Sequence, residues 1–299
     1  MFLSIQDIQL NYNESAGWLL NIILAFVMLG VALGLKISDF KQVMLFPKAF
    51  LTGVFAQFIL LPFLTLCLVL LWNPHPAIAL GMFLVAACPG GNVSNFISRL
   101  AGANTALSIS LTATATALSA FMTPINFVFW GSLYEPSSLL MRSIEMDVWQ
   151  LFVSIFLVLA LPLTMGLIIT RLFPLFAQKA GKAIRLISFF VFVLFIVIAF
   201  SANYRNFIDF IDYVFGLVLI HNFLALFGGF LLATLNGLSM KDKKSITIET
   251  GIQNSGLGLL IIFSFFGGMG GMAIVAAWWG IWHIIAGLLI SFVFSRIKS

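Results

Sequence analysis

Two polar stretches interrupt an otherwise apolar chain: Cys-Pro-Gly-Gly-Asn-Val-Ser-Asn at residues 88–95 and Glu-Thr-Gly-Ile-Gln-Asn-Ser-Gly at residues 249–256. Each belongs to a run about as long as a helix needs to cross a bilayer, roughly 20 residues. Proline removes a backbone donor and glycine weakens a helix. Amide and hydroxyl side chains beside a break can satisfy the backbone groups that it frees. The sequence therefore predicts two membrane helices that are interrupted at membrane depth.

The composition of the whole chain agrees with a membrane protein. Of 299 residues, 62% are apolar and 8% are charged, whereas about a quarter of a soluble domain is charged. So few charges cannot cover a globule in water, which excludes a soluble enzyme, a nucleic-acid-binding protein and a disordered chain. We predict an all-α polytopic membrane protein, with residues 1–299 forming a single domain. Nine apolar spans lie between the charges: 17–35, 47–71, 76–98, 104–130, 148–170, 184–202, 212–236, 245–266 and 272–295.

The basic residues predict how these spans are oriented. Of the fifteen Lys and Arg residues, only Arg142 and Arg205 fall on one side of the nine spans. Cytoplasmic loops carry the excess of Lys and Arg, so we predict an outside N-terminus, a cytoplasmic C-terminus and an odd number of spans. The basic loops then face cytosol and anionic lipid, with no need for nucleic acid. The thirteen inner residues are Lys36, Lys41, Lys48, Arg99, Arg171, Lys179, Lys182, Arg185, Lys241, Lys243, Lys244, Arg296 and Lys298.

One acidic residue lies within a span. Nine of the ten Asp and Glu residues are in loops or termini, and the tenth is Glu249 in the eighth span. A carboxylate at membrane depth is costly unless it is paired, so it indicates a functional site. Two alternatives stay open: the side chain reaches the cytoplasmic interface, or it is protonated. The glycines and amides that follow it favour the functional interpretation.

The two halves of the chain carry corresponding features. Gln57 in the second span precedes Pro89 by 32 residues, and Asn222 in the seventh precedes Gly251 by 29. Interrupted helices in corresponding positions of two halves are a sequence indication of a secondary transporter's binding site. We predict that spans 1–4 and 6–9 are copies with inverted topology and that span 5 has no counterpart.

The polar residues also predict the kind of ion. Glu249 is accompanied by hydroxyls, of which Ser108 and Thr112 share a helix face because they are four residues apart. No Cys or His cluster is available for a transition metal, and a divalent ion usually recruits several carboxylates. An oxygen-only shell of low charge favours sodium. A proton on Glu249 stays open as the rival.

These residues resemble the bile acid:sodium symporter family. Residues 88–95, followed by Ala-Leu-Ser at 106–108 and Thr112, resemble its first hallmark, and Glu-Thr-Gly-Ile-Gln-Asn at 249–254 resembles its second. Ala-Gln-Phe at 56–58 with Pro62, and Trp282-His283, match further positions, so that the resemblance covers about residues 18–295. Many bacterial members have ten helices, whereas the resemblance implies nine for this chain, as in the vertebrate liver member.

The resemblance implies an architecture and two sodium sites. A core with two unwound, crossing helices would comprise about 76–130 and 245–295, and a panel about 17–71 and 148–236. Carried over by position, the first sodium site would use the side chains of Ser94, Asn95, Ser108, Thr112 and Glu249. The second would use the side chains of Gln57, Glu249 and Gln253 with the carbonyls of Thr250 and Ile252. The multi-pass protein would lie in a bacterial inner membrane.

The implied substrate is an organic anion, such as a bile acid, a steroid conjugate or a small carboxylate. Asn92 and Asn254 flank the breaks and are expected to offer amide donors to its carboxylate or sulfonate. The resemblance adds His283, although Ile284 stands where some bacterial members have an asparagine. Sodium and the anion would bind in turn, the core would move against the panel, and no obligate protein partner is expected.

Other functions fit the sequence less well. An intramembrane aspartyl protease or a prenyl transferase needs at least two acidic residues at membrane depth, and this chain has one, so we predict that it is not an enzyme. Two alternatives stay open: a proton-coupled anion carrier of the same fold, and a sensor that binds an organic anion without moving it.

Overall fold

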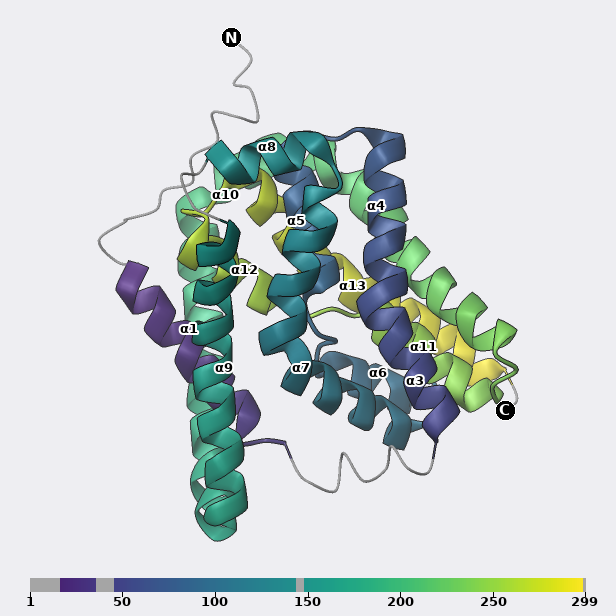
Figure 1. The fold of residues 1–299 in the computed structure, drawn as a ribbon. Helices are drawn as coiled ribbons and strands as arrows, with labels where there is room; N and C mark the ends of the chain where they lie inside the picture. The colour runs from purple at the N-terminus through teal and green to yellow at the C-terminus, as the bar shows by residue number, and fades with distance from the viewer. Residues whose placement is uncertain (1–16, 36–45, 144–147, 298–299) are drawn as a thin grey trace.

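The computed structural model describes residues 17–35, 46–143 and 148–297, and these residues are helical apart from short connections (Figure 1). Within them, the single strand-like feature is an isolated bridge between Gly90 and Gln253. The loop lysines Lys36, Lys41 and Lys298 lie outside the described residues. The helices are α1 (Gly17–Ala32), α3 (Pro47–Phe55), the π-helical turn η4 (Ala56–Leu60), α4 (Leu61–Trp72), α5 (Pro76–Ala87), α6 (Val93–Leu100), α7 (Thr105–Ser132), α8 (Glu135–Ser143), α9 (Val148–Leu172), α10 (Pro174–Leu235), α11 (Met240–Gly251), α12 (Ser255–Phe265) and α13 (Gly270–Arg296).

The described part of the chain has the helices of a membrane protein. Five are long and apolar enough to cross a bilayer: Pro47–Trp72, Thr105–Ser132, Trp149–Leu172, Ile211–Leu235 and Gly270–Arg296. Three apolar helices are shorter: Trp18–Ala32, Pro76–Ala87 and Ser255–Phe265. The all-helical membrane class is thus confirmed, and the count of nine crossings stays a prediction.

The short helices result from the two polar stretches. The third predicted span is divided into α5 and α6 by residues 88–92, and the eighth into α11 and α12 by residues 252–254. Cys88 and Ile252, the residues after α5 and α11, both have extended backbone conformations. Each predicted break is therefore a short extended segment between two half-helices.

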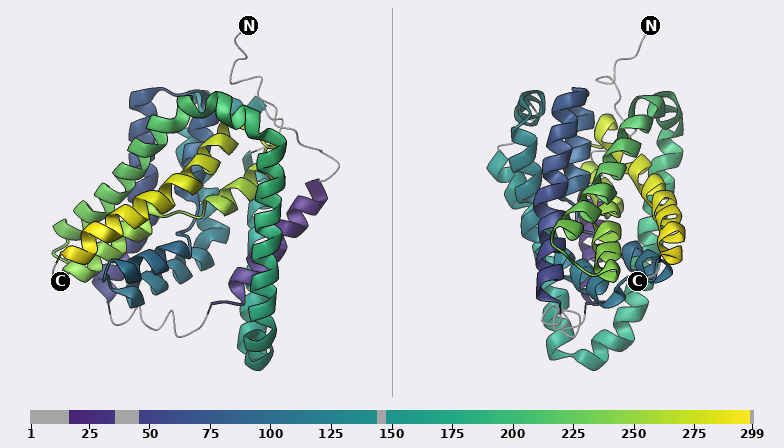
Figure 2. Two further views of the ribbon diagram at one scale, coloured as in Figure 1. Left: turned by 180° about the vertical axis from the view of Figure 1, so that it is seen from behind. Right: turned by 90° about the vertical axis from the view of Figure 1, so that its right-hand side faces the viewer.

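One expectation about the helices was wrong. Spans 184–202 and 212–236 were predicted as separate helices, but both lie in α10, a helix of 62 residues. At 1.5 Å per residue such a helix would be about 90 Å long if straight, three times the hydrocarbon thickness. It therefore bends, at the end of the molecule opposite the α9–α10 turn (Figure 2). Residues 203–211 contain neither proline nor glycine, so nothing in them stops helical hydrogen bonding.

Helix α5 lies at the centre of the packing. Every residue from Ala77 to Ala87 is buried, and α5 packs against α4, α7 and α13. On its α13 side, a Cβ at Gly81 would lie 2.8 Å from the backbone of Met272. The break that follows α5 is therefore held at the centre of the molecule.

Helices α1, α9 and α10 pack against one another. A Cβ at Gly166 of α9 would lie 2.4 Å from the Cβ of Ala32 in α1. The pair α3–α4 packs mainly against α5, α7, α10 and α11. Packing thus places α3–α4 against helices of the expected core and also against α10 of the expected panel. The assignment of 47–71 to the panel and the division into two moving parts therefore stay predictions.

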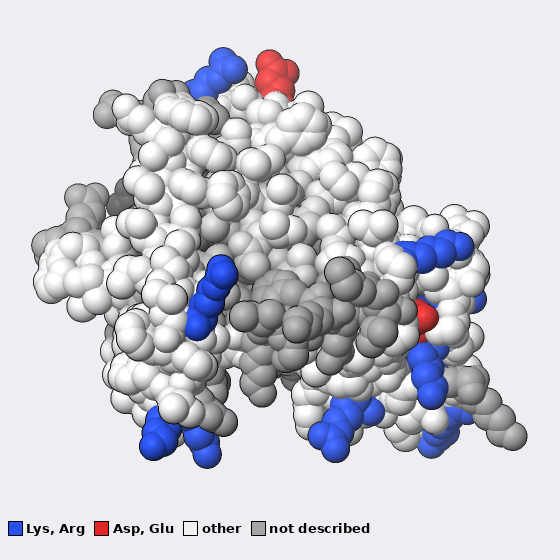
Figure 3. Space-filling model, turned by 60° about the horizontal axis from the view of Figure 1, so that its bottom comes forward, with Lys and Arg blue, Asp and Glu red and all other residues white. Residues whose placement is uncertain are grey.

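The charged side chains gather at the ends of the molecule. Figure 3 looks toward the end that carries the α9–α10 turn and shows basic side chains spread over it, with few acidic ones. Between the ends, large apolar side chains such as Leu51, Phe63, Phe223 and Phe292 are exposed. An apolar belt between charged ends is what a bilayer requires.

Candidate functional site

The two breaks cross and are joined by their backbones. The Gly91 N–H donates to the Ile252 carbonyl at 3.0 Å, and the Asn254 N–H donates to the Pro89 carbonyl at 2.9 Å. These bonds flank the antiparallel bridge between Gly90 and Gln253. Because backbone groups at membrane depth must find partners inside the protein, the two breaks stabilise each other.

Side chains from neighbouring helices satisfy other carbonyls freed by the breaks. The Thr123 hydroxyl donates to the Ala87 carbonyl at 3.0 Å, and the Gln57 amide donates to that of Cys88 at 2.9 Å. The Asn222 amide donates to the Gly251 carbonyl at 2.7 Å. Gln57 lies in the π-helical turn η4 and is buried. The two amides predicted from their spacing, Gln57 and Asn222, thus each contact the break that follows them in the sequence.

Glu249 lies beside this crossing and is 3% exposed. Its Oε2 accepts hydrogen bonds from Ser94 Oγ at 2.7 Å and Ser108 Oγ at 3.1 Å, and its Oε1 accepts one from Thr112 Oγ1. Asn95 Oδ1 accepts from Ser108 Oγ at 2.9 Å and from Thr112 Oγ1 at 3.2 Å. The structure therefore brings together all five residues that the sequence assigned to the first sodium site.

Around Glu249, the close oxygen–oxygen contacts outnumber the hydroxyl protons that could make them hydrogen bonds. Besides the five contacts above, Thr112 Oγ1 lies 3.3 Å from Ser94 Oγ and 3.1 Å from the Ser108 carbonyl, which makes seven. The three hydroxyls supply one proton each, so at least four contacts join oxygens that share no proton. A proton on Glu249 would supply one more. A cation bound among these oxygens would stabilise the contacts that lack a proton. The set of oxygen ligands therefore fits a hard monovalent ion.

The residues assigned to the second sodium site are close together but hydrogen-bonded to one another. Gln57 Nε2 donates to Gln253 Oε1 at 2.9 Å, and Gln253 Nε2 donates back to Gln57 Oε1 at 3.0 Å. Gln253 Nε2 also donates to the Thr250 carbonyl at 2.8 Å, and the Ile252 carbonyl accepts from Gly91. The described contacts of the Glu249 carboxylate are all with the first group. Each amide oxygen thus already accepts one hydrogen bond from the other amide, and a cation at the second site would compete with this pairing.

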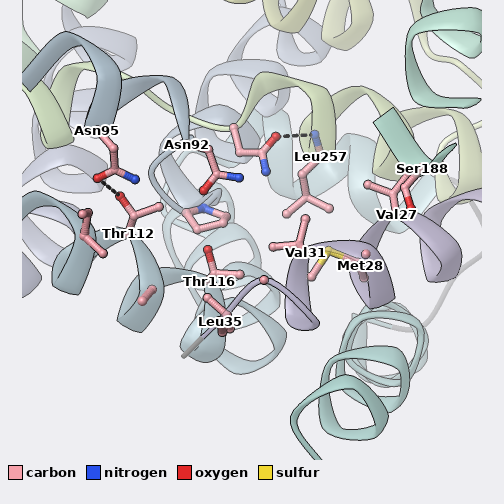
Figure 4. Close-up of a pocket in the computed structure, with 16 residues that line it drawn as sticks. Val27, Met28, Val31, Leu35, Asn92, Asn95, Thr112, Thr116, Ser188 and Leu257 are labelled. Carbon is pink, nitrogen blue, oxygen red and sulfur yellow. Dashed lines mark hydrogen bonds between the residues drawn. The ribbon is translucent and has the colours of Figure 1, made fainter. Parts of the chain in front are cut away.

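A cavity of about 600 Å³ opens beside the crossing (Figure 4). Its polar lining includes Asn92 and Asn254, the two residues predicted to contact an anion, and also Asn95 and Thr112 from the Glu249 group. Asn92 precedes α6 and Asn254 precedes α12, so the N-termini of two half-helices border the cavity and favour negative charge. No Lys or Arg is among the described residues that line it, which otherwise include Val27, Met28, Val31 and Leu257.

His283 is not part of this arrangement. It lies in α13, is 5% exposed and does not line the cavity. Its Nδ1 has no hydrogen-bond partner among the described residues. Its neighbour Ile284 is exposed on the same helix. The structure therefore brings Asn92 and Asn254 to one cavity but leaves His283 outside it.

Comparison with known proteins agrees with the resemblance of the motifs. The model of the Sodium Bile acid symporter family matches residues 21–210, well over half of the chain. The chain belongs to this family. The matched segment includes the first break with Ser94 and Thr112, while Glu249 follows it.

Individual relatives are also similar to the chain over most of its length. The uncharacterized sodium-dependent transporter YocS of Bacillus subtilis is 31% identical over 93% of this chain and 83% of its own. The probable chloroplastic sodium/metabolite cotransporter BASS1 of Oryza sativa is 27% identical over 82% of this chain, which spans 58% of that protein. Human P3 protein is 26% identical over 76% of this chain, which spans 46% of it.

Sequence reasoning missed one wall of the cavity in this family member. Val27, Met28 and Val31 come from α1, and Ser188 comes from α10. In the sequence these residues belong to ordinary apolar spans, and only the packing of α1 against the broken helices gives them a role. The one indirect signal was the predicted panel, which contained both segments.

Proposed function

We propose that the protein is a sodium-coupled secondary transporter that moves an organic anion across the membrane by alternating access. The observation that carries the proposal is the Glu249 group, in which seven oxygen contacts share three hydroxyl protons beside two crossing half-helices. The relatives named as sodium-dependent transporters and sodium/metabolite cotransporters support the choice of ion. Membership of the family supports transport rather than enzyme chemistry.

Two sodium ions bind in this proposal. The first is held by Ser94, Asn95, Ser108, Thr112 and Glu249. The second is held by Gln57, Gln253 and Glu249 with the carbonyls of Thr250 and Ile252, and it separates the paired amides as it binds. Because both sites involve the crossing of α5–α6 and α11–α12, sodium fixes the two broken helices against each other.

The anion binds in the cavity between α1 and the crossing. Asn92 and Asn254 donate amide hydrogens to its carboxylate or sulfonate, and the apolar side chains from α1 contact its body. No Lys or Arg is among the described lining residues, and in this proposal the bound sodium ions and the half-helix N-termini supply positive potential. An amphipathic anion such as a bile acid or steroid conjugate fits this lining, and a small carboxylate is the alternative. A contact by His283 stays a prediction from the family resemblance alone.

The proposed coupling is strong enough to concentrate an anion. Two sodium ions and one anion move one net positive charge, which gives about 2.3 kcal/mol at about 100 mV. Two roughly tenfold sodium gradients add about 2.8 kcal/mol. The sum of about 5 kcal/mol supports an accumulation on the order of several thousandfold.

The first experiment is a thermal melt of the detergent-purified protein, titrated with sodium chloride against choline chloride at constant ionic strength. A ligand that binds only the folded state raises the melting temperature by mass action. We expect a saturable, sodium-specific rise that is absent in E249Q and weakened in S108A.

The matched control is S119A, because the Ser119 hydroxyl, on the same helix, donates to the Thr116 carbonyl and has no described contact with Glu249. S119A should keep the sodium response of the unmodified protein. The proposal would be contradicted if sodium did not change the melting temperature at any pH, or if E249Q kept the sodium response of the unmodified protein. The first of these results would favour proton coupling.

Uptake separates a transporter from a sensor. Proteoliposomes with a sodium gradient should accumulate radiolabelled taurocholate or pantoate, which represent an amphipathic and a small organic anion. A sensor would bind one of them without accumulation.

A further inference from the structure

Asn95 lies between the Glu249 group and the cavity. Its Oδ1 accepts hydrogen bonds from Ser108 Oγ and Thr112 Oγ1, so the oxygen end of its amide faces the proposed ion. The residue is half-buried and lines the cavity. In Figure 4 its amide nitrogen lies on the side of the amide that faces Asn92.

An asparagine amide can take this position in two orientations. Rotation by 180° exchanges its oxygen and nitrogen, which have nearly the same shape. The rotated amide would donate its hydrogens to the lone pairs of Ser108 and Thr112 and would turn its oxygen toward the cavity. A cation among the oxygens repels the N–H groups and attracts the carbonyl oxygen. The cation therefore selects the orientation in which the N–H groups face the cavity.

We propose that Asn95 couples the ion to the substrate: sodium at Glu249 holds its oxygen, and this turns its N–H donors toward the anion in the cavity. The inference rests on the proposed function and adds a residue that contacts both ligands. Because coupling between two sites is reciprocal, an anion that accepts from Asn95 strengthens the binding of sodium by the same factor.

The other two asparagines of the cavity do not share this position. Asn254 Oδ1 accepts from the Leu257 N–H at 3.0 Å at the start of α12, so a backbone group sets its orientation. Asn92 has no described hydrogen bond with Ser94, Ser108, Thr112 or Glu249 and makes no cap bond to α6. Among the described residues that line the cavity, Asn95 is thus the asparagine whose orientation depends on the ion.

The test compares N95D with N92D. Both variants add one negative charge to the cavity wall, so they share any general repulsion of the anion. An aspartate at position 95 keeps an oxygen for the ion but has no N–H to donate. For each protein, the apparent sodium affinity is measured by thermal melt without anion and with saturating taurocholate or pantoate.

We expect the anion to tighten sodium binding in the unmodified protein by a factor within the usual range of about 5–150. N95D places a second carboxylate beside Glu249, so its sodium affinity without anion should differ from that of the unmodified protein, but the anion should no longer enhance it, giving a factor near one. N92D should need more anion for saturation yet keep the enhancement. If N95D does not fold, N95S replaces it and should show weaker sodium binding with a factor near one.

Three results would overturn the inference. They are an undiminished factor in N95D or N95S, an equal loss in N95D and N92D, and a sodium response in the unmodified protein that neither anion changes. All three results are compatible with a sodium site at Glu249. The proposed function would fail by a different result, in which the melting temperature of the unmodified protein does not respond to sodium in the absence of anion.

Discussion

Gly90 lies where the first break passes close to the Glu249 carboxylate at the centre of the site. A Cβ built on Gly90 would lie 2.6 Å from Glu249 Oε1, closer than side-chain carbons come to an oxygen. The absence of a side chain is therefore what lets the extended segment pass over the carboxylate. At Gly91, the nearest atom to such a Cβ is the Gln253 carbonyl oxygen at 3.4 Å, an ordinary contact.

These two glycines allow a matched pair of substitutions. G90A should displace the Glu249 carboxylate from the hydroxyls of Ser94 and Thr112, so sodium should raise the melting temperature much less than in the unmodified protein. G91A adds the same methyl group without that clash and should keep most of the sodium response. The measurement is the sodium titration of the melting temperature, and equal responses in the two variants would contradict this role for Gly90.

The chemistry of the first site was predictable because it depends on which residues are present. One carboxylate at membrane depth, with hydroxyls on a neighbouring helix, indicates a cation whatever the exact geometry. The pairing of Gln57 with Gln253 was not predictable, because it depends on how closely η4 approaches the break between α11 and α12. The close approach of Gly90 to Glu249 could not be predicted for the same reason, because it depends on where along the two helices the breaks cross.

At the scale of elements, α7 holds the end of α5 in place. The Ala87 carbonyl would normally accept from the N–H four residues later, but the Gly91 N–H donates to Ile252 instead. The Thr123 hydroxyl of α7 fills this place and is fully buried. Helix α7 thus carries ligands for the proposed ion and also a cap for the broken helix.

T123V tests this cap with a side chain of the same shape. The buried Ala87 carbonyl would lose its donor, and an unsatisfied buried group costs about 1–3 kcal/mol. T170V is the control, because the Thr170 hydroxyl donates to the Gly166 carbonyl within its own helix. Thermal melts without sodium should show a clearly lower melting temperature for T123V than for T170V. Equal melting temperatures would mean that α5 needs no cap from α7.

Helix α5 has a second cap at its other end. His75 Nδ1 accepts from the Ala77 N–H at 3.3 Å, and burial lowers the pKa of His75 from its ordinary value of 6.5. The folded protein therefore holds this imidazole neutral at pH values where the unfolded chain protonates it. The stabilisation is complete above about pH 6.5 and is lost as the pH falls through the lowered pKa.

H75N should remove this pH dependence while keeping a cap, because asparagine is a favoured N-cap residue. The measurement is the difference in melting temperature between pH 7.5 and pH 5.0. That difference should be smaller in H75N than in the unmodified protein. An identical difference in both proteins would show that protonation of His75 does not affect the start of α5.

Over the whole molecule, the cavity lies where two groups of helices meet. One wall comes from α1 and α10, and the other from α6, α7 and α12 at the crossing. A rigid-body shift between the groups would open the cavity to one side or the other, as alternating access requires. The ion group lies within α6, α7 and α11, so in this proposal it moves as part of one body.

The topology of the whole molecule can be tested at three exposed positions. E135C in α8, K179C at the start of α10 and R205C near its bend are introduced singly into a C67A background, where the remaining Cys88 is buried. A membrane-impermeant maleimide is applied to spheroplasts before and after permeabilisation. We expect E135C and R205C to react in intact spheroplasts, and K179C only after permeabilisation. This pattern requires one crossing by α9 and another by the first half of α10, with α8 and the bend outside.

Labelling of K179C alone in intact spheroplasts would show that the orientation is the reverse of the one that the loop charges predict. Labelling of K179C and R205C from the same side would mean that the first half of α10 does not cross, and that the count of nine is too high.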